Sequence, residues 1–246
     1  MKQVTYTILE NVPLAPNVYR MVLAGDTSPI AAPGQFVNLK LEGLYLRRPI
    51  SVCDVEGDKL TLIYKVVGAG TAQLSRMAPG EALDALSGLG NGYDLSLAGD
   101  RPVLVGGGVG VPPLYLLAKR LVEQGKVVTV CLGFNTRDEV FYEDEFRALG
   151  CEVRVSTADG SHGTRGFVTA VLPDDPTHYF ACGPEPMLRA VFDALRCPGQ
   201  LSFEARMGCG FGACMGCTCE TLTGYKRICK DGPVMRKEEL TWNARA

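Results

Sequence analysis

Residues 207–219 read MGCGFGACMGCTC, which places four cysteines and four glycines within thirteen positions. A fifth cysteine follows at position 229, so five of the ten cysteines in the chain lie within 21 residues. A group this tight occurs as a disulfide framework, as a zinc site or as the ligand set of a redox cluster. Each of these requires a different protein around it, so this stretch constrains the fold more than any other.

Composition and the N-terminal sequence predict a reducing compartment for these thiols. Of the 246 residues 46% are hydrophobic and 21% charged, with a formal charge of −2, a globular balance without a basic surface for nucleic acid or acidic membranes. The first residues, MKQVTYTILE, lack the apolar segment of a signal peptide, and no apolar run approaches a membrane span. We therefore expect a cytoplasmic protein without nucleic-acid or membrane partners, which disfavours a disulfide framework.

The spacing of Cys209, Cys214 and Cys217 is C-x4-C-x2-C, and Cys229 supplies a fourth thiol. This is the plant-type spacing of a [2Fe–2S] cluster, in which four thiolates bind two irons. The interspersed glycines permit the tight turns that bring backbone amides onto sulfur. Zinc is the main alternative, but zinc sites usually pair cysteines in two short knuckles, and only Cys214 and Cys217 clearly form one. The spacing favours the cluster, with Cys219 as a non-ligand.

Short runs of β-type residues, broken by Pro, Gly, Asn and Asp, fill residues 1–99. Examples are VTYTIL, GQFVNLKL, RRPISVCDV and KLTLIYKVV. Such runs at short intervals predict an antiparallel β-barrel or sandwich. One short helix is expected over residues 72–77, just after Gly70 and Thr71.

From residue 100 to residue 200, strand-like and helix-like segments alternate. The apolar segment 102–108 ends in glycines, and residues 112–125 carry an amphipathic helical pattern that begins with two prolines. Further strands are expected over 126–134, 151–157 and 177–184, and further helices over 138–149 and 185–196. This alternation predicts a doubly wound parallel α/β domain.

The alternation is expected to stop at residue 201. Residues 201–246 carry the cysteine group and little apolar material, so we expect a small lobe that is ordered by whatever the cysteines bind. The chain is thus predicted to be an α+β multi-domain protein, with a β-barrel over 1–99, an α/β domain over 100–200 and a cysteine lobe over 201–246.

Two short segments suggest phosphate binding. GGGVG at 106–110 follows a predicted strand and opens a predicted helix, where backbone amides can meet phosphate oxygens. The match to G-x-G-x-x-G is incomplete because Val111 occupies the third glycine position, and glycines in such a turn often serve the turn alone. Arg48 in RRPIS could bind a pyrophosphate or lie in a solvated turn.

Taken in order, several motifs resemble the ferredoxin–NADP reductase superfamily, in which a flavin-binding barrel precedes a pyridine-nucleotide domain. They are PGQF (33–36), RPIS (48–51), GAGT (68–71), GLGNGY (88–93), GGGVGVPPL (106–114) and CGPEPML (182–188). The C-terminal MGCGFGACMGC and YKRICKDGPV resemble the electron-transfer subunits of the NAD-linked, class B dihydroorotate dehydrogenases. The resemblance covers almost the whole chain.

The resemblance implies FAD, a [2Fe–2S] cluster and NAD as cofactors. Arg48 would neutralise the FAD pyrophosphate and Ser51 would lie by the isoalloxazine ring. The FAD residues implied are Arg48, Pro49, Ile50, Ser51, Ile63, Tyr64, Lys65, Gly70 and Thr71, although Ile63 and Tyr64 could equally be plain strand residues. The NAD residues implied are Gly107, Gly108, Gly110, Cys182, Gly183 and Pro184. The cluster ligands implied are Cys209, Cys214, Cys217 and Cys229.

The resemblance also implies a function in pyrimidine biosynthesis. Electrons from the oxidation of dihydroorotate to orotate would reach the FMN of a separate catalytic subunit, in a heterotetramer, and would pass through the cluster and FAD to NAD+. No catalytic acid–base residue is expected in this chain. One alternative is the diaphorase-type FAD and [2Fe–2S] subunit of a hydrogenase or of a bifurcating transhydrogenase. The alternative from another class is a non-catalytic zinc-binding adaptor.

The sequence does not decide whether the chain prefers NAD or NADP. Asn135 and Arg137 follow the predicted strand 126–134 and could lie near the ribose. Arg137 could accept a 2′-phosphate, or could cap the acidic helix that follows. The resemblance favours NAD.

Overall fold

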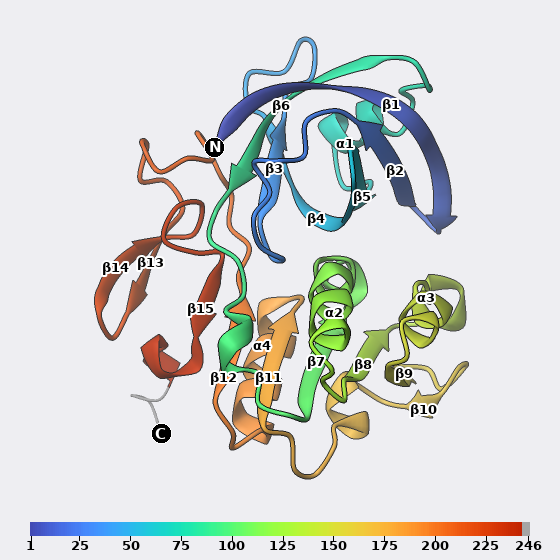
Figure 1. Ribbon diagram of the computed structural model, residues 1–246, viewed down its shortest axis with the longest axis vertical. Coiled ribbons are helices and arrows are strands. Elements are labelled where there is room, and N and C mark those ends of the chain that lie inside the picture. The colour runs from blue at the N-terminus through green and yellow to red at the C-terminus, as the bar shows by residue number, and fades with distance from the viewer. Residues whose placement is uncertain (243–246) are drawn as a thin grey trace.

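Alternating burial closes the N-terminal strands into a barrel. In β1 (Lys2–Ala15) every second side chain from Val4 to Ile8 is buried, which places one face of the strand in the barrel interior. The other barrel strands are β2 (Val18–Ala24), β3 (Phe36–Leu39), β4 (Arg48–Glu56), β5 (Lys59–Lys65) and β6 (Ala82–Leu89). They pair antiparallel in the closed order β1-β2-β5-β4-β3-β6 (Figure 1). The computed structural model, which describes residues 1–242, confirms the barrel.

The short helix of the barrel, α1 (Ala69–Leu74), begins three residues before the position that the sequence predicts. The Thr71 hydroxyl accepts hydrogen bonds from the amides of Val67 at 2.9 Å and Gly68 at 3.2 Å, and so starts the helix ahead of residue 72. At its other end the side-chain amide of Asn11 donates to the carbonyls of Leu74 and Met77, both at 2.9 Å. These bonds satisfy carbonyls that a longer helix would use, so the helix stops at Leu74.

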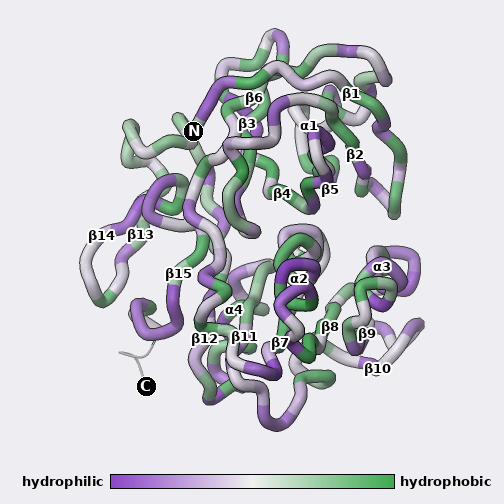
Figure 2. The backbone as a smooth tube through the Cα atoms, viewed as in Figure 1, coloured by the Kyte–Doolittle hydropathy of each residue, from purple (hydrophilic) through white to green (hydrophobic). Residues whose placement is uncertain are grey.

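A seven-stranded sheet follows the barrel. Its order is β10-β9-β8-β7-β11-β12-β15, and the pairings are parallel except the last, between β12 and β15. The strands are β7 (Pro102–Gly107), β8 (Thr129–Phe134), β9 (Glu152–Thr157), β10 (Thr164–Arg165), β11 (His178–Cys182), β12 (Gly199–Ser202) and β15 (Val234–Arg236). The tube in Figure 2 shows mostly apolar residues along β7 and β8, as expected for strands that are covered on both faces.

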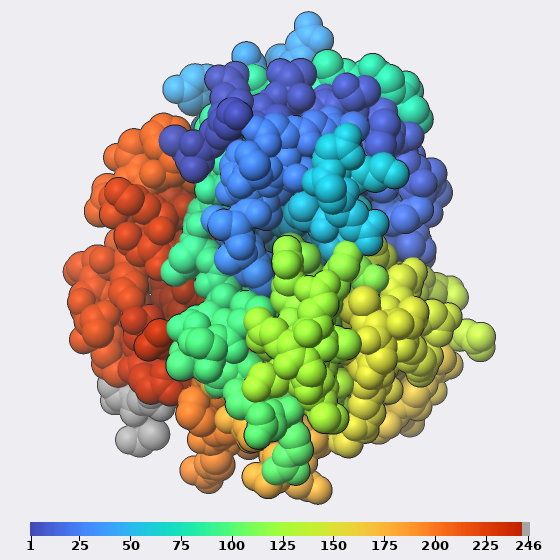
Figure 3. Space-filling model, viewed as in Figure 1, coloured from blue at the N-terminus to red at the C-terminus, as the bar shows by residue number. Residues whose placement is uncertain are grey.

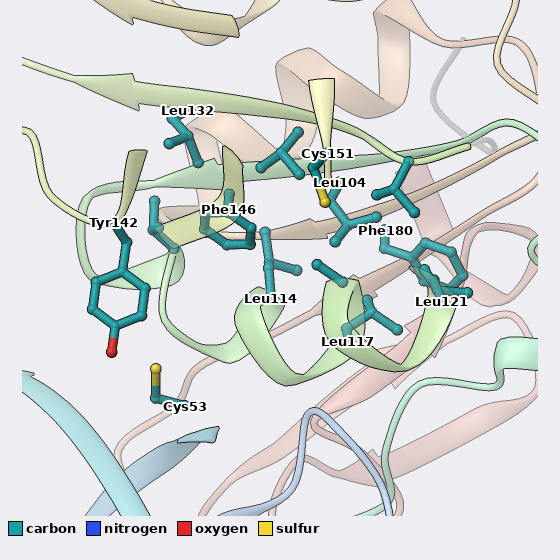
Figure 4. Close-up of a cluster of buried hydrophobic side chains, with 14 of the residues drawn as sticks. Cys53, Leu104, Leu114, Leu117, Leu121, Leu132, Tyr142, Phe146, Cys151 and Phe180 are labelled. Atoms are coloured by element: carbon teal, nitrogen blue, oxygen red, sulfur yellow. The ribbon is translucent and has the colours of Figure 1, made fainter. Parts of the chain in front are cut away.

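Helices cover both faces of this sheet, which confirms the doubly wound arrangement. On one face α2 (Pro113–Glu123) packs Leu114, Leu117 and Leu121 against Leu104 and Phe180, as Figure 4 shows, and α3 (Glu143–Ala148) adds Phe146. On the other face α4 (Glu185–Ala194) buries Leu188, Val191 and Phe192. Successive residues of β7 alternate between these two cores, because strand side chains point to opposite faces.

The predicted helix over 138–149 is shortened to α3. Tyr142 adopts φ 65, in the left-handed region, and so interrupts a helix before Glu143. The interruption buries both aromatic residues, since the Phe141 ring lies 5.3 Å from that of Phe134 and the Tyr142 ring 5.1 Å from that of Tyr115. Aromatic packing therefore overrides the helical pattern here.

The C-terminal segment shares the sheet and core of the α/β part. The predicted end of the α/β pattern at residue 201 cuts through β12, which runs to Ser202, and β15 adds an edge strand beside it. A hairpin of β13 (Thr218–Thr221) and β14 (Gly224–Arg227) completes the segment, which packs along the side of the molecule in Figure 3. The expectation that this segment lacks a core is wrong, because its few apolar residues join a core shared with the α/β part. Buried in one cluster with Leu201 are Cys217, Ile228, Cys229, Met235 and Leu240.

Barrel and sheet are held together through α2. The Lys119 ammonium lies 3.1 Å from a carboxylate oxygen of Asp54 and 2.9 Å from one of Glu56, both in β4. In Figure 4 the Tyr142 hydroxyl points toward the sulfur of Cys53, also in β4. No helix within residues 1–242 has the length and apolar character to cross a membrane.

Candidate functional site

The topological switch point of the sheet lies between β7 and β11. From β7 the chain continues to β8 on one side, while β11 and β12 lie on the other. The carboxyl end of β7 is the glycine run at Gly106, which pairs in register with Cys182 at the end of β11. Open α/β sheets bind ligands at this position, because the connecting loops diverge there and leave a crevice.

A cavity of about 710 Å³ opens at the switch point, a volume in the range of cofactor sites. It lies between the barrel, the sheet and the cysteine segment, since its lining includes Phe36 of β3, Phe134 of β8 and Met207. Nine of the residues implied by the resemblance line it together: Pro49, Ser51, Lys65, Gly107, Gly108, Gly110, Cys182, Gly183 and Pro184. The structure thus brings the RPIS segment and the two nucleotide motifs to one space.

The glycines of the nucleotide loop have different structural reasons. Gly108 has φ +52 with nothing within 4 Å of where a Cβ would stand, so its backbone faces open space. A Cβ on Gly110 would instead overlap the carbonyl oxygen of Cys182 and come within 2.6 Å of the Cα of Gly183. Gly110 is therefore required by the close approach of the two nucleotide motifs, whereas Gly108 is left accessible to a ligand.

Cys182 lines the cavity at the end of β11, and the buried Tyr93 supports this strand from the core. The Tyr93 hydroxyl donates to the carbonyl of Ala181 at 3.2 Å and holds the end of β11. Burial raises the pKa of the Cys182 thiol to about 12, against the opposing effect of the Ser202 hydroxyl. Cys182 is thus a neutral thiol, suited to a contact and not to nucleophilic chemistry. Tyr93 was not singled out from sequence, although it ends the GLGNGY motif.

Arg48, Gly70 and Thr71 form a second group, outside the lining of the cavity. A Cβ on Gly70 would overlap the guanidinium of Arg48, so the first turn of α1 and this arginine lie in contact. The Arg48 guanidinium also donates to the carbonyl of Leu46. The fork of donors beside a glycine-rich first turn suits a pyrophosphate.

Ile50, Ile63 and Tyr64 do not reach the cavity. Tyr64 is buried in the barrel, where its hydroxyl donates to Asn11 at 2.8 Å and its ring stacks on Tyr19 at 5.9 Å. Burial raises the pKa of Tyr64. Ile63 is buried in the core beneath α2, and Ile50 packs partly buried on the barrel core. The structure gives these three side chains packing roles.

The cysteines meet in two pairs, an outer pair of Cys209 and Cys214 and an inner pair of Cys217 and Cys229. The amide of Cys214 donates to the sulfur of Cys209 at 3.4 Å and the amide of Cys209 to the sulfur of Cys214 at 3.5 Å. Separately, the amide of Cys229 donates to the sulfur of Cys217 at 3.4 Å. Within residues 1–242 no three His, Cys, Asp or Glu side chains gather as a single ion would require. Two thiol pairs fit a cluster of two irons, each bound by two thiolates, better than one tetrahedral zinc.

The cysteine loop also favours thiolate at the outer pair. Burial raises the pKa of Cys209, but the backbone amides of Cys214, Phe211 and Ala213 and the Cys214 side chain outweigh it and lower the pKa to about 6. At the inner pair, burial and the neighbouring Cys217 raise the pKa of Cys229 to about 12. Amides directed at sulfur stabilise negative charge there, as a thiolate-bound cluster needs.

The loop is held from both sides by residues that sequence reasoning missed. Asn38 of β3 donates its side-chain amide to the carbonyl of Cys209 at 3.3 Å, and Arg227 donates to the carbonyl of Gly212 at 2.9 Å. Arg227 is itself fixed by Asp231, 2.9 Å away. Asn38 carries no motif, and its only signal is a polar residue within an apolar strand pattern.

Comparisons with known proteins agree with this geometry. Residues 204–241 match the family described as the iron-sulfur cluster binding domain of dihydroorotate dehydrogenase B, and residues 104–193 match the oxidoreductase NAD-binding domain. The electron transfer subunit of dihydroorotate dehydrogenase B (NAD(+)) from Geobacillus sp. (strain WCH70) is 46% identical, over 98% of this chain and 99% of the relative. The chain belongs to the family of dihydroorotate dehydrogenase B electron transfer subunits.

Other relatives of this family are similarly close. The electron transfer subunit from Fusobacterium nucleatum is 45% identical over 95% of this chain and 96% of its own length. Among solved structures, the NADH-dependent reduced ferredoxin-NADP oxidoreductase studied for flavin-based electron bifurcation has a TM-score of 0.87 and 31% identity, over 97% of this chain and 90% of that chain. A ferredoxin NADP+ reductase from Neisseria gonorrhoeae, at TM-score 0.69, 17% identity and coverage of 79% and 90%, shares the fold.

The family membership confirms the fold and the electron-transfer role that the resemblance implied. The protein is an NAD-linked oxidoreductase subunit with a ferredoxin–NADP reductase-like fold, and FAD, an iron–sulfur cluster and NAD are its cofactors. The words "electron transfer subunit" in the names of its relatives imply a catalytic partner for those proteins.

Proposed function

We propose that this chain passes electrons from the FMN of a catalytic subunit to NAD+ while that subunit oxidises dihydroorotate to orotate in pyrimidine biosynthesis. The observation that carries this proposal is the single cavity lined by Ser51 of the barrel, Gly108 of the nucleotide loop and Met207 of the cysteine segment. A space shared by all three parts suits a chain whose task is to bring cofactors close together.

Within this cavity the residues have separable tasks. Ser51, Pro49 and Lys65 would face the flavin ring, and Arg48 with the first turn of α1 at Gly70 and Thr71 would hold the FAD pyrophosphate. Ile50, Ile63 and Tyr64 would support this pocket from behind, since their side chains pack in the cores on either side of β4 and β5. Gly107, Gly108 and Gly110 would receive the NAD phosphates, and Cys182, Gly183 and Pro184 the nicotinamide.

At the cysteine segment the residues fit a two-iron cluster. Cys209 with Cys214 would bind one iron and Cys217 with Cys229 the other, in keeping with the two pairs and with the amides directed at Cys209. When bound, the cluster supplies single-electron transfer and FAD converts single electrons into the hydride that NAD+ accepts. Cys219 lies half-buried with its sulfur 4.0 Å from that of Met235, and is not part of either pair.

The substrate chemistry would belong to the partner. Oxidation of dihydroorotate needs a base to remove a proton, and we assign no such residue to this chain. A mutation in this chain that leaves assembly intact should therefore not abolish dihydroorotate oxidation with an artificial electron acceptor. We further propose a heterotetramer of two subunits of each kind, in the cytoplasm, where a reducing environment keeps the cysteines free.

The cysteine loop would form part of the surface that meets the catalytic subunit. Phe211 is 43% exposed and Met215 is 54% exposed, and both lie between the ligand cysteines. Met215 adopts the left-handed region at φ 60, in a turn between Cys214 and Cys217. Replacing Phe211 by Ser should weaken assembly with the FMN subunit, whereas Leu9→Ser, a comparable apolar side chain on β1 at 44% exposure, should not.

The proposed function is tested on chain purified without oxygen together with its FMN partner. Iron, sulfide and flavin assays should give a two-iron cluster and FAD on this chain, and NADH should bleach the flavin absorbance. Co-purification from the native source separates the partner of this family from a hydrogenase or transhydrogenase partner, a distinction made relevant by the 31% identity to the bifurcating oxidoreductase. Zinc without flavin would overturn the proposal in favour of an adaptor.

A further inference from the structure

One end of the cavity is formed where β8 ends and the 3-10 helix Val168–Val171 begins. Asn135, Glu139 and Phe167 line the cavity there. This end belongs to the nucleotide side of the switch point, because it lies on the β8 side of the glycine loop. A dinucleotide whose phosphates lie on that loop would extend its adenosine half to one side of the loop, along the edge of the sheet.

The Glu139 carboxylate is held in place by its neighbour. Its Oε2 accepts hydrogen bonds from the backbone amide of Asn135 at 3.1 Å and from the Asn135 side-chain amide at 2.8 Å. Both bonds end on Oε2. Among residues 1–242 no donor reaches Oε1, which leaves that oxygen for a ligand. The carboxylate is therefore preorganised as an acceptor.

The fixed charge at this end of the cavity is negative. Glu139 shares its turn, Arg137–Glu139, with the arginine that could have accepted a 2′-phosphate. Arg137 does not line the cavity, and its backbone amide donates to the Ser161 hydroxyl at 2.7 Å. The other charged residues of the lining, Lys65 and Glu204, come from β5 and from the segment after β12.

Phe167 supplies an apolar surface in the same cavity. Its side chain is 77% exposed although it lines the cavity, so its ring face is open to a planar ligand. Exposed aromatic faces bind nucleobases by stacking. A carboxylate acceptor and an aromatic side chain in one cavity match the ribose diol and the adenine of an adenosine.

We propose that Glu139 determines the choice of nucleotide, accepting a hydrogen bond from the adenosine ribose of NAD(H) and rejecting the 2′-phosphate of NADP(H). This inference rests on the proposed function, since it assumes that the cavity holds a pyridine dinucleotide. A 2′-phosphate carries between one and two negative charges at neutral pH, as other phosphate monoesters do. Placing it against a fixed carboxylate, with no arginine in the lining, costs binding free energy.

The experiment measures binding of ADP-ribose and of its 2′-phosphate to the assembled holoprotein by titration calorimetry. In the parent protein ADP-ribose should bind and its 2′-phosphate should bind at least roughly tenfold more weakly. Glu139→Gln keeps the shape and removes the charge, so it should narrow this ratio by roughly tenfold while the flavin spectrum stays unchanged. Asp138→Asn removes a neighbouring exposed charge outside the lining and should leave the ratio as it is.

Steady-state reduction of an artificial acceptor gives a second readout. Glu139→Gln should lower KM for NADPH relative to NADH, with little change in kcat, because the residue acts on binding. If ADP-ribose binds but Glu139→Gln leaves the ratio unchanged, the inference is overturned and the proposed function stands. If neither nucleotide binds to the parent protein, the dinucleotide site itself is wrong and both fall.

Discussion

The side-chain amide of Asn38 donates a hydrogen bond to the carbonyl oxygen of Cys209 at 3.3 Å. Asn38 is 1% exposed and lies in β3, opposite Pro49 of the RPIS segment in β4. A Cβ on Gly210 would overlap this amide, so the loop also packs directly on it. The barrel strand that pairs with the RPIS segment thus also holds the cysteine loop at Cys209.

Asn38→Leu should loosen this junction. The substitution keeps the approximate volume but removes the donor, leaving the partly buried carbonyl of Cys209 without its partner, and should cost about 1 kcal/mol of unfolding free energy. Urea unfolding measures the loss, and amide exchange should accelerate over residues 207–216. Gln73→Ala breaks a surface bond of the same kind, from a side-chain amide to the Glu42 carbonyl at 3.3 Å, and serves as the control. Equal losses in the two variants would contradict the assigned role.

Cys217→Ser and Cys219→Ser should differ sharply although they are two residues apart. Cys217 belongs to the inner pair and receives the amide of Cys229, whereas Cys219 contacts Met235. We expect Cys217→Ser to lose iron and sulfide and the cluster absorbance, while Cys219→Ser keeps both, because a serine oxygen is a poor substitute for a thiolate ligand. Iron and sulfide per chain, determined without oxygen, are the measurement. Loss of iron in both variants would show that Cys219 is a ligand.

Gly110→Ala should be more damaging than Gly108→Ala. At Gly110 the added Cβ overlaps the Cys182 carbonyl, which is backbone and cannot rotate away, so overpacking should cost about 1–3 kcal/mol or more. At Gly108 the cost is confined to the left-handed backbone, about 1 kcal/mol, since space around it is open. Urea unfolding and KM for NADH are measured together, and Gly110→Ala should raise KM by distorting the switch point. A larger effect at Gly108 would refute this account.

His178 should make folding sensitive to mild acid. Burial lowers its pKa from 6.5 to about 4, and the side-chain amide of Gln200 lies 3.2 Å from its Nε2. Below pH 6.5 the unfolded chain binds a proton that the folded chain does not accept until about pH 4. Stability from neutral His178 is therefore complete above pH 6.5 and is lost as pH falls toward 4, by about 1–3 kcal/mol.

The measurement for His178 is the urea midpoint between pH 7 and pH 4 for the parent and for His178→Gln. Other carboxylates contribute to acid sensitivity in both proteins, so the informative quantity is the difference between the two slopes. The parent should lose more stability than the variant over this window. Parallel curves would mean that His178 does not titrate as its burial requires.

The barrel and the parallel sheet follow directly from local sequence patterns. The alternation from Val4 to Ile8 and the amphipathic run in α2 repeat at the periods of a strand and a helix, so each reports its own secondary structure. The spacing of Cys209, Cys214 and Cys217 is local in the same way. Such features can be predicted from the sequence because the residues that define them are near one another along the chain.

Deviations arose where a distant residue overrode the local pattern. The side-chain amide of Asn11 in β1 donates to the carbonyls at the end of α1, and burial of Phe141 and Tyr142 interrupts the helix predicted over 138–149. The C-terminal segment was expected to lack a core because its own apolar residues are few. That expectation failed because these residues pack against partners in α4 and β12. Local composition does not show which surface a short segment will meet.

By itself the sequence determined the barrel, the doubly wound sheet, the cysteine set and the order of the flavin and nucleotide motifs. Only the tertiary structure decided that these motifs meet in one cavity, that Asn38 ties the barrel to Cys209, and that Glu139 rather than Arg137 lines that cavity. The physical reason is that periodicity and spacing are set by short-range backbone geometry. The approach of side chains from different elements is set by packing across the whole molecule.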